Sequence, residues 1–267
     1  MIVEHESRIG QLFDSYVRSW GPICWRDQCA KIQAPINCEY GTMLYALGLI
    51  ETDSVVMRRK LAATRADRSN PIKQFNILWL AEEAEHGRAL EAAAEKLGVR
   101  SLTFSSRRSI RDLRSIATWP ALYLSGFLVP HLDAAYCTLG SVQEYIALTT
   151  YRRIGEKLGD PALDGLLRQI AQQEGRHMKF YRGAAQVLLE PRQARRVTAA
   201  LLARLWRPPG VDLFGLPKWL EIFRPILEDD VYVGRLLRAD DLLADLIGDS
   251  IARPMKRFLE TNQTLLL

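Results

Sequence analysis

Several features that are common in other protein classes are scarce in this sequence. Alternation of polar and apolar residues, the pattern of strands, is nearly absent, so an all-α fold is expected. The four cysteines contain no CxxC pair and form no dense framework, which favours a reducing compartment over a disulfide-stabilised fold. The first ten residues carry early acids and no apolar stretch, so no secretory signal is expected. These absences together predict a cytoplasmic helical protein.

Long apolar runs and nucleic-acid signatures are missing as well. The most apolar segment, residues 119–140, is interrupted by Pro120 and Pro130 and by polar residues, which predicts buried helix and no membrane span. The formal net charge of +5 permits an acidic partner, either protein or nucleic acid. No basic motif with interleaved aromatic residues is present, so nucleic-acid binding is not expected.

Helical periodicity dominates what is present in the 267 residues, of which 48% are hydrophobic. Two helical hairpins of similar design are predicted, one from segments 39–64 and 69–98 and the other from 133–159 and 159–191. Residues 103–120 are expected to connect the hairpins through a short basic helix. We predict a four-helix bundle over about 40–190 with a helical appendage over about 191–267, as one domain of 1–267.

Capping residues bound the second arm of each hairpin. Each arm is expected to begin with a polar N-cap followed by proline, and to end at a residue that terminates helices. These residues are Asn70, Pro71 and Gly98 in the first hairpin and Asp160, Pro161 and Pro191 in the second.

The same two arms each contain a glutamate three residues before a histidine. Residues at i and i+3 share a helix face, so each pair can present a carboxylate and an imidazole to the bundle interior. The first arm of each hairpin supplies one further glutamate at a comparable depth. One glutamate from each of two helices and Glu-x-x-His from each of the other two is the ligand set of di-iron carboxylate bundles. The predicted ligands are Glu51, Glu83, His86, Glu144, Glu174 and His177.

Chance is the competing explanation for one such pair, but it does not explain two pairs with matching caps and upstream acids. Other acids fit less well, because Glu82 and Glu85 lack the three-residue spacing to a histidine. Asp53 lies about 200° round the helix from Glu51 and is expected to face away from the site. The other two histidines, His5 and His131, have no glutamate three residues before them and are expected to be structural or solvated.

The residues around these positions resemble the soluble acyl-ACP desaturases, which act on acyl chains carried by acyl-carrier protein and belong to the ferritin-like superfamily. WLAEEAEHG is close to that family's W-x-A-E-E-x-x-H-G signature, and VQEYIALTTYRR is similar to its third ligand helix. IAQQEGRHMKFYR looks like the bacterial members, and LIETDSVVMRRKLA agrees with the first ligand helix in spacing. Carried over by position, the family's iron ligands fall on the same six residues, and Trp79 matches a buried tryptophan beside the site.

The resemblance implies a ferritin-like bundle with two iron ions that uses O₂ to introduce a double bond into the acyl chain, in fatty acid metabolism. It also implies a ferredoxin-type electron donor, acyl-carrier protein as partner and a homodimer. The sequence departs from the family pattern at two positions: Ala147 stands where the family usually has threonine, and Gln173 where it usually has an aspartate that orients a ligand histidine. Thr149 and Thr150 are not in helical phase to replace the missing hydroxyl.

Three functions therefore compete at this stage. A desaturase leads, followed by a related di-iron oxygenase that hydroxylates or N-oxygenates a tethered or free substrate, and then by a non-catalytic bundle. Basic segments are candidate docking sites for the acidic carrier, although a solvated helix surface is the commoner explanation for any one of them. They comprise Arg58, Arg59 and Lys60; Arg107, Arg108, Arg111 and Arg114; and Arg192, Arg195 and Arg196.

Overall fold

A computed structural model describes residues 2–64, 69–101, 129–248 and 253–266 of the chain. These residues form eleven helices and no strand, so the predicted all-α class is confirmed. The connector 103–120, with its expected basic helix, and the apolar residues 119–128 lie outside the described residues. No helix within the described ranges combines the length and the apolar character needed to cross a bilayer. All four cysteines are free thiols.

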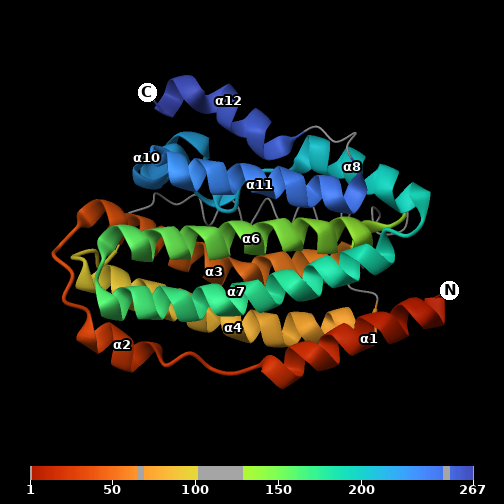
Figure 1. The fold of residues 1–267 in the computed structure, drawn as a ribbon, viewed down its shortest axis with the longest axis horizontal. Helices are drawn as coiled ribbons and strands as arrows, with labels where there is room; N and C mark the ends of the chain where they lie inside the picture. The colour runs from red at the N-terminus through yellow and green to blue at the C-terminus, as the bar shows by residue number, and fades with distance from the viewer. Residues whose placement is uncertain (1, 65–68, 102–128, 249–252, 267) are drawn as a thin grey trace.

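Four long helices form the ferritin-like bundle, and their ends agree with the predicted hairpin arms to within three residues. They are α3 (Cys38–Thr64), α4 (Asn70–Lys96), α6 (Leu132–Leu158) and α7 (Pro161–Leu188). The most extensive contacts are α3 with α4 and α6 with α7, which are the two hairpins read from the sequence. Figure 1 shows these helices side by side, with the N-termini of α4 and α6 near the same end of the bundle.

The helix ends follow the predicted capping residues with one difference. Asp160 caps α7 by accepting a hydrogen bond from the backbone N–H of Leu163 at 2.8 Å. Gly98 follows the end of α4 with φ of +92°, a conformation that suits glycine at this position. Asn70 is not the N-cap of α4, as predicted, because Ser69 has the extended backbone of a cap and the helix begins at Asn70.

The shorter helices cover two sides of the bundle (Figure 1). On one side α1 (Ile2–Ser19) and α2 (Trp25–Lys31) contact α4 and α7. The C-terminal layer on the other side consists of α8 (Arg192–Leu205), α9 (Val211–Phe214), α10 (Leu216–Leu227), α11 (Asp230–Ile247) and α12 (Pro254–Leu266). In this layer α8 contacts α6, α10 contacts α3 and α11 contacts α6. A face of α3 and α6 is therefore covered by the C-terminal part of the chain.

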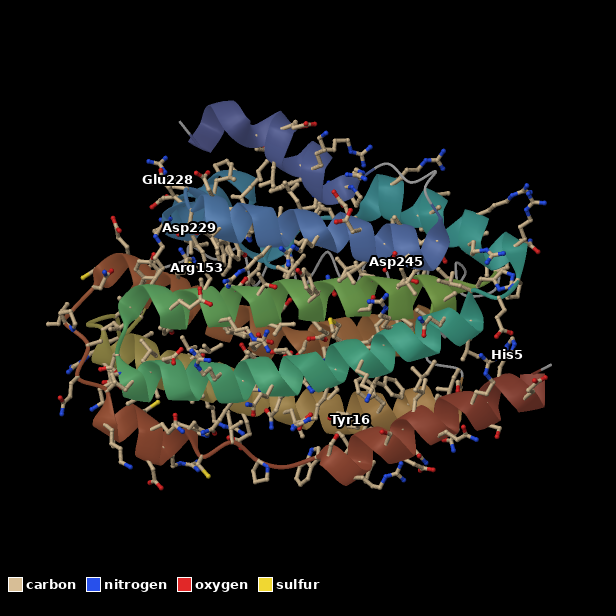
Figure 2. The ribbon with its side chains drawn as sticks, in the orientation of Figure 1. His5, Tyr16, Arg153, Glu228, Asp229 and Asp245 are labelled. Carbon is tan, nitrogen blue, oxygen red and sulfur yellow. The ribbon has the colours of Figure 1, made fainter. Side chains whose placement is uncertain are left out.

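Asp229 attaches this layer to the bundle. It caps α11 by accepting a hydrogen bond from the backbone N–H of Tyr232 at 2.9 Å. Its carboxylate also receives two hydrogen bonds from Arg153 of α6, at 3.0 and 2.7 Å, and pairs with Lys157 at 2.7 Å. Figure 2 shows Arg153 and Asp229 together at the contact between α6 and α11. The Arg153 guanidinium holds the pKa of Asp229 well below its ordinary value.

Two substitutions of Asp229 should distinguish the contribution of the helix cap to stability from that of the ion pairs. Asp229→Ala removes both and should lower the free energy of unfolding by about 2 kcal/mol, whereas Asp229→Asn keeps a capping oxygen and should cost about half as much. Because the pKa of Asp229 is lower in the folded state, the advantage of the native protein over Asp229→Asn should be complete above about pH 4 and should fall as the pH is lowered further. Urea unfolding at several pH values measures both effects, and equal stability of the two variants would contradict the capping role.

Candidate metal centre

The six predicted ligands converge at the centre of the bundle. Glu51 comes from α3, Glu83 and His86 from α4, Glu144 from α6, and Glu174 and His177 from α7. None of these side chains is more than 8% exposed. They form two groups in which the potential ligand atoms all lie within 4.8 Å of one another: Glu51, Glu83, His86 and Glu174, and Glu83, Glu144, Glu174 and His177.

Two of the carboxylates belong to both groups. Because Glu83 and Glu174 are shared, each can reach two neighbouring metal ions, while the remaining ligands can reach one each. Glu51 and His86 complete one group, here named the His86 position. Glu144 completes the other with His177, here named the His177 position. The arrangement can therefore hold two metal ions, each with one terminal carboxylate and one imidazole, joined by two bridging carboxylates.

The hydrogen bonding inside the cluster fits metal ions. Three of its buried atoms have no hydrogen-bond partner, namely Oε1 of Glu83, Oε1 of Glu174 and Nδ1 of His86. Buried polar atoms are rarely left without a partner in folded proteins. The Nδ1 of His86 lies 3.1 Å from Oε1 of Glu174, and the Nδ1 of His177 lies 3.2 Å from Oε1 of Glu83. Metal ions bound among these atoms would satisfy them, and a set of carboxylate oxygens and imidazoles suits iron.

Burial and crowding change the acidity of the ligands. Burial raises the pKa of Glu51 and of Glu144, and the charges of Glu83 and Glu174 raise them further. Burial alone lowers the pKa of His86, but Glu174 and Glu83 outweigh this effect and raise the pKa to about 10. Protons on the imidazoles and outer carboxylates therefore balance part of the buried negative charge when no metal is bound.

Each histidine is held on its outer side by a residue of the opposite helix. The Nε2 of His86 lies 2.6 Å from Oε1 of Gln173, and the Nε2 of His177 lies 2.7 Å from Oε2 of Glu82. Since both partners are acceptor oxygens, Nε2 donates in each pair and Nδ1 is left as the ligand atom that faces the cluster. Gln173 is therefore the residue that holds His86.

Glu82 is a contributor that the sequence reasoning missed. It lacks the three-residue spacing to a histidine of its own helix, but its carboxylate reaches His177 across the bundle. Tyr16 of α1, labelled in Figure 2, donates a hydrogen bond to Oε2 of Glu82, and Arg176 donates to Oε1 at 3.2 Å. A signal was present in the sequence, because Glu82 immediately precedes Glu83 as Gln173 precedes Glu174.

The two terminal carboxylates are also anchored by neighbouring donors. The indole N–H of Trp79 donates to Oε1 of Glu144 at 3.0 Å, which places this tryptophan beside the site as expected. The hydroxyl of Tyr151, a fully buried residue of α6, donates to Oε1 of Glu51. Each terminal glutamate thus accepts one hydrogen bond from an aromatic side chain.

Glycines bring α3 and α4 close together next to the cluster. A Cβ atom at Gly87, which follows His86, would lie 2.7 Å from the side chain of Thr52 and 3.1 Å from the carbonyl oxygen of Gly48. A Cβ at Gly48 would likewise lie 3.0 Å from the carbonyl oxygen of Gly87. Only glycine allows this separation, which sets Glu51 at the depth of Glu83 and His86.

A cavity of about 420 Å³ adjoins the cluster. Glu51, Glu83 and Glu144 border it, and most of its other lining side chains are apolar. They come from α3, α4, α6 and α8 and from residues 206–213. Ala147 lines this cavity, so the missing hydroxyl would have faced its interior. The expectation that Asp53 faces away from the site is wrong, because Asp53 also borders the cavity. The lining residues of α3 extend from Ile50 to Ser54 and so include it.

The remaining candidates lie elsewhere or have other partners. The hydroxyl of Thr150 donates to the carbonyl of Ile146 and contacts the hydroxyl of Tyr232, so it is not directed to the cluster. His5 lies 3.2 Å from Glu190, and Glu85 accepts a hydrogen bond from Trp25. His131 is the N-cap of α6 with φ of 59°, and its side chain makes no capping hydrogen bond.

The basic segments are only partly described. The side chains of Arg58, Arg59 and Lys60 on α3, and the whole of Arg107, Arg108, Arg111 and Arg114, lie outside the described residues. Arg192, Arg195 and Arg196 are exposed in the first turns of α8. The structure therefore places only this last group on a surface.

Comparison with known proteins identifies a family. A family model described as fatty acid desaturase matches residues 52–211, which is more than half of the chain. This span contains five of the six cluster residues and begins one residue after Glu51. Neither the curated proteins nor the solved structures contain a match to the chain.

Metal binding should stabilise the fold, because the ions bind the native cluster and not the unfolded chain. A divalent metal at about 100 times its dissociation constant adds about 2.7 kcal/mol, so Fe(II) added without oxygen should raise the midpoint of thermal unfolding by several degrees. Glu174→Gln should remove most of this rise, since Glu174 belongs to both groups. Glu85→Gln, at a partly exposed position of α4 outside the cluster, is the matched control and should keep it. An equal rise in both variants would place the metal outside this cluster.

Proposed function

The chain belongs to the fatty acid desaturase family, and from this premise we propose that it is a di-iron, O₂-dependent acyl-ACP desaturase, an oxidoreductase of fatty acid metabolism. The observation that carries the proposal is the pair of shared carboxylates, Glu83 and Glu174, between two four-residue groups. Members of this family typically use two irons, and the six residues supply a ligand set for them.

The bound irons would supply the oxidation: O₂, two external electrons and two protons convert two adjacent methylenes into an alkene and yield two waters. The protein must hold the acyl chain beside the metal centre and keep other water out. The apolar wall of the cavity is suited to both tasks, and Glu51 and Glu144 place its polar part at the cluster. We assign the supply of electrons to a ferredoxin-type donor and the assembly to a homodimer, as in the acyl-ACP desaturases that the sequence resembles.

The shape of the cavity supports an extended acyl substrate. Its lining residues on α6 run from Leu132 to Ala147, a distance of about 22 Å along the helix at a rise of 1.5 Å per residue. Arg207 and Asp212 also border the cavity, and their side chains are 66% and 74% exposed. We infer that the cavity opens to solvent at this exposed border, where a chain attached to a carrier would enter.

A basic row on α8 leads toward this entrance. Arg192, Arg195 and Arg196 are exposed and form no ion pair with other described residues, and α8 ends next to Trp206 and Arg207 in the cavity wall. Unpaired arginines on one helix attract an acidic surface. We place the docking surface for acyl-carrier protein along α8, on the side of the molecule opposite α1 and α2 (Figure 1).

A related oxygenase is the second candidate, and Ala147 favours it. Because Ala147 lines the cavity without a hydroxyl, proton delivery at the metal centre differs from that in the acyl-ACP desaturases. Oxygen transfer to the substrate, as hydroxylation or N-oxygenation, is the alternative outcome of the same oxidation.

The products distinguish the two reactions. The iron-loaded protein should convert an acyl-carrier-protein thioester, with a reduced ferredoxin and O₂, into a product lighter by two hydrogens. Gain of one oxygen atom, detected by mass spectrometry of the acyl group, would instead establish the oxygenase. His177→Ala and Glu144→Ala should hold fewer than two irons per chain and form no product, because each removes a terminal ligand. Iron content and product formation that match those of the parent would refute the ligand assignment.

Charge reversal on α8 tests the carrier. Arg195→Glu combined with Arg196→Glu should slow turnover of carrier-bound substrate by about tenfold or more at low salt, with iron content unchanged. Added salt should narrow the difference, since exposed charges are screened within about 8 Å at physiological ionic strength. Arg18→Glu with Lys31→Glu makes the same change in net charge on α1 and α2 and should leave turnover unaltered. If both double variants slow turnover equally, α8 is not the docking surface.

A further inference from the structure

The two metal positions are equivalent in their ligands. Each has one terminal glutamate, one histidine and the shared pair Glu83 and Glu174. Each terminal glutamate also accepts one hydrogen bond from an aromatic residue, from Tyr151 in one position and from Trp79 in the other. A difference in metal affinity must therefore come from residues outside the ligand set.

Such a difference exists in the residues that hold the two histidines. His177 donates to the carboxylate of Glu82, whereas His86 donates to the neutral amide oxygen of Gln173. The two holding residues occupy corresponding places, immediately before the shared glutamates of α4 and α7. The crossed contacts have nearly the same length, 2.7 and 2.6 Å, so the two pairs differ in charge and not in distance.

Neighbouring residues preserve this difference. Tyr16 donates to the same Glu82 oxygen that His177 contacts, and Arg176 donates to the other oxygen at 3.2 Å. The carboxylate of Glu82 therefore accepts hydrogen bonds from three side chains, those of His177, Tyr16 and Arg176. The amide N–H of Gln173 donates to the carbonyl of Gly21 at 2.6 Å, which turns the amide oxygen toward His86.

The charge on the acceptor affects the ligand atom across the ring. A carboxylate that accepts a hydrogen bond from Nε2 fixes the orientation of the imidazole and makes Nδ1 a stronger ligand for a metal ion. Loss of such a partner typically costs 10- to 100-fold in metal affinity. A neutral amide fixes the orientation but adds less electron density. From these contacts we propose that Glu82 and Gln173 are positioning residues that make the two metal positions unequal, so that the His177 position binds its ion first and more tightly. The inference rests on the proposed two-metal site.

Titration of the metal-free protein with Co(II) tests this order. Co(II) takes the same oxygen and nitrogen ligands as Fe(II) and is stable in air. Its visible absorption should rise in two steps whose dissociation constants differ by about 10- to 100-fold. In proton NMR spectra, the Nε2–H of each metal-bound histidine should give one shifted, exchangeable signal. One such signal should appear at the first equivalent of Co(II) and the other at the second.

Two variants identify the positions. Glu82→Gln should shift the signal that appears first and weaken the tighter step by about tenfold or more, which brings the two steps together. Gln173→Leu removes the acceptor of His86, so it should shift the later signal and weaken only the second step. Tyr16→Phe leaves the contact between Glu82 and His177 in place and should narrow the separation less than Glu82→Gln does. It serves as the milder variant if Glu82→Gln folds poorly, and circular dichroism checks the folding of all three.

The possible outcomes separate this inference from the proposed function. Two Co(II) ions bound with equal affinity by the parent protein overturn the inequality and leave the two-metal site intact. The inference is also overturned if Gln173→Leu shifts the signal that appears first. Fewer than two ions bound per chain overturn both the inference and the proposed function. None of these measurements depends on catalytic turnover.

Discussion

The structure depends on the burial of four carboxylates and two imidazoles at the centre of a helical bundle. An ion moved from water into a protein interior costs several kcal/mol even after relaxation, so such a cluster persists only with compensating charges and hydrogen bonds. The neighbouring residues supply them, because Trp79, Tyr151, Glu82 and Gln173 each contact one ligand. Two bound dications would balance the four negative charges, and for this reason a polar centre is compatible with an otherwise apolar core.

The surrounding layers serve this centre in different ways. Helices α1 and α2 cover α4 and α7, and Tyr16 and Gly21 on that side reach the residues that orient the histidines. The C-terminal helices cover α3 and α6, where the cavity borders the opposite side of the cluster. The residues that orient the two histidines and the cavity are therefore on different sides of the cluster. A change in the cavity, such as Ala147, can alter the reaction without disturbing the ligands.

The two hairpins resemble each other in ligands and differ in what surrounds them. Their correspondence follows from the repeated Glu-x-x-His spacing, which fixes two side chains on one helix face. Their environments diverge because the N-terminal segment contacts the two hairpins through different groups: the hydroxyl of Tyr16 donates to Glu82, whereas the carbonyl of Gly21 accepts from Gln173. An approximate repeat in sequence thus becomes a centre whose two halves have the same ligands but different supports, a charged one at His177 and a neutral one at His86.

The sequence by itself determined the helices, the two hairpins and the six residues that meet at the centre, because helical periodicity, caps and i, i+3 spacing are local. It did not determine that Glu82 reaches His177, that Tyr16 supports Glu82 or that Asp53 borders the cavity. These relations join segments far apart in the chain, and helical phase relates only residues of the same helix. Only the packing of α1 on α4 and α7, and of the C-terminal helices on α3 and α6, decided which side chains surround the ligands and where the cavity lies.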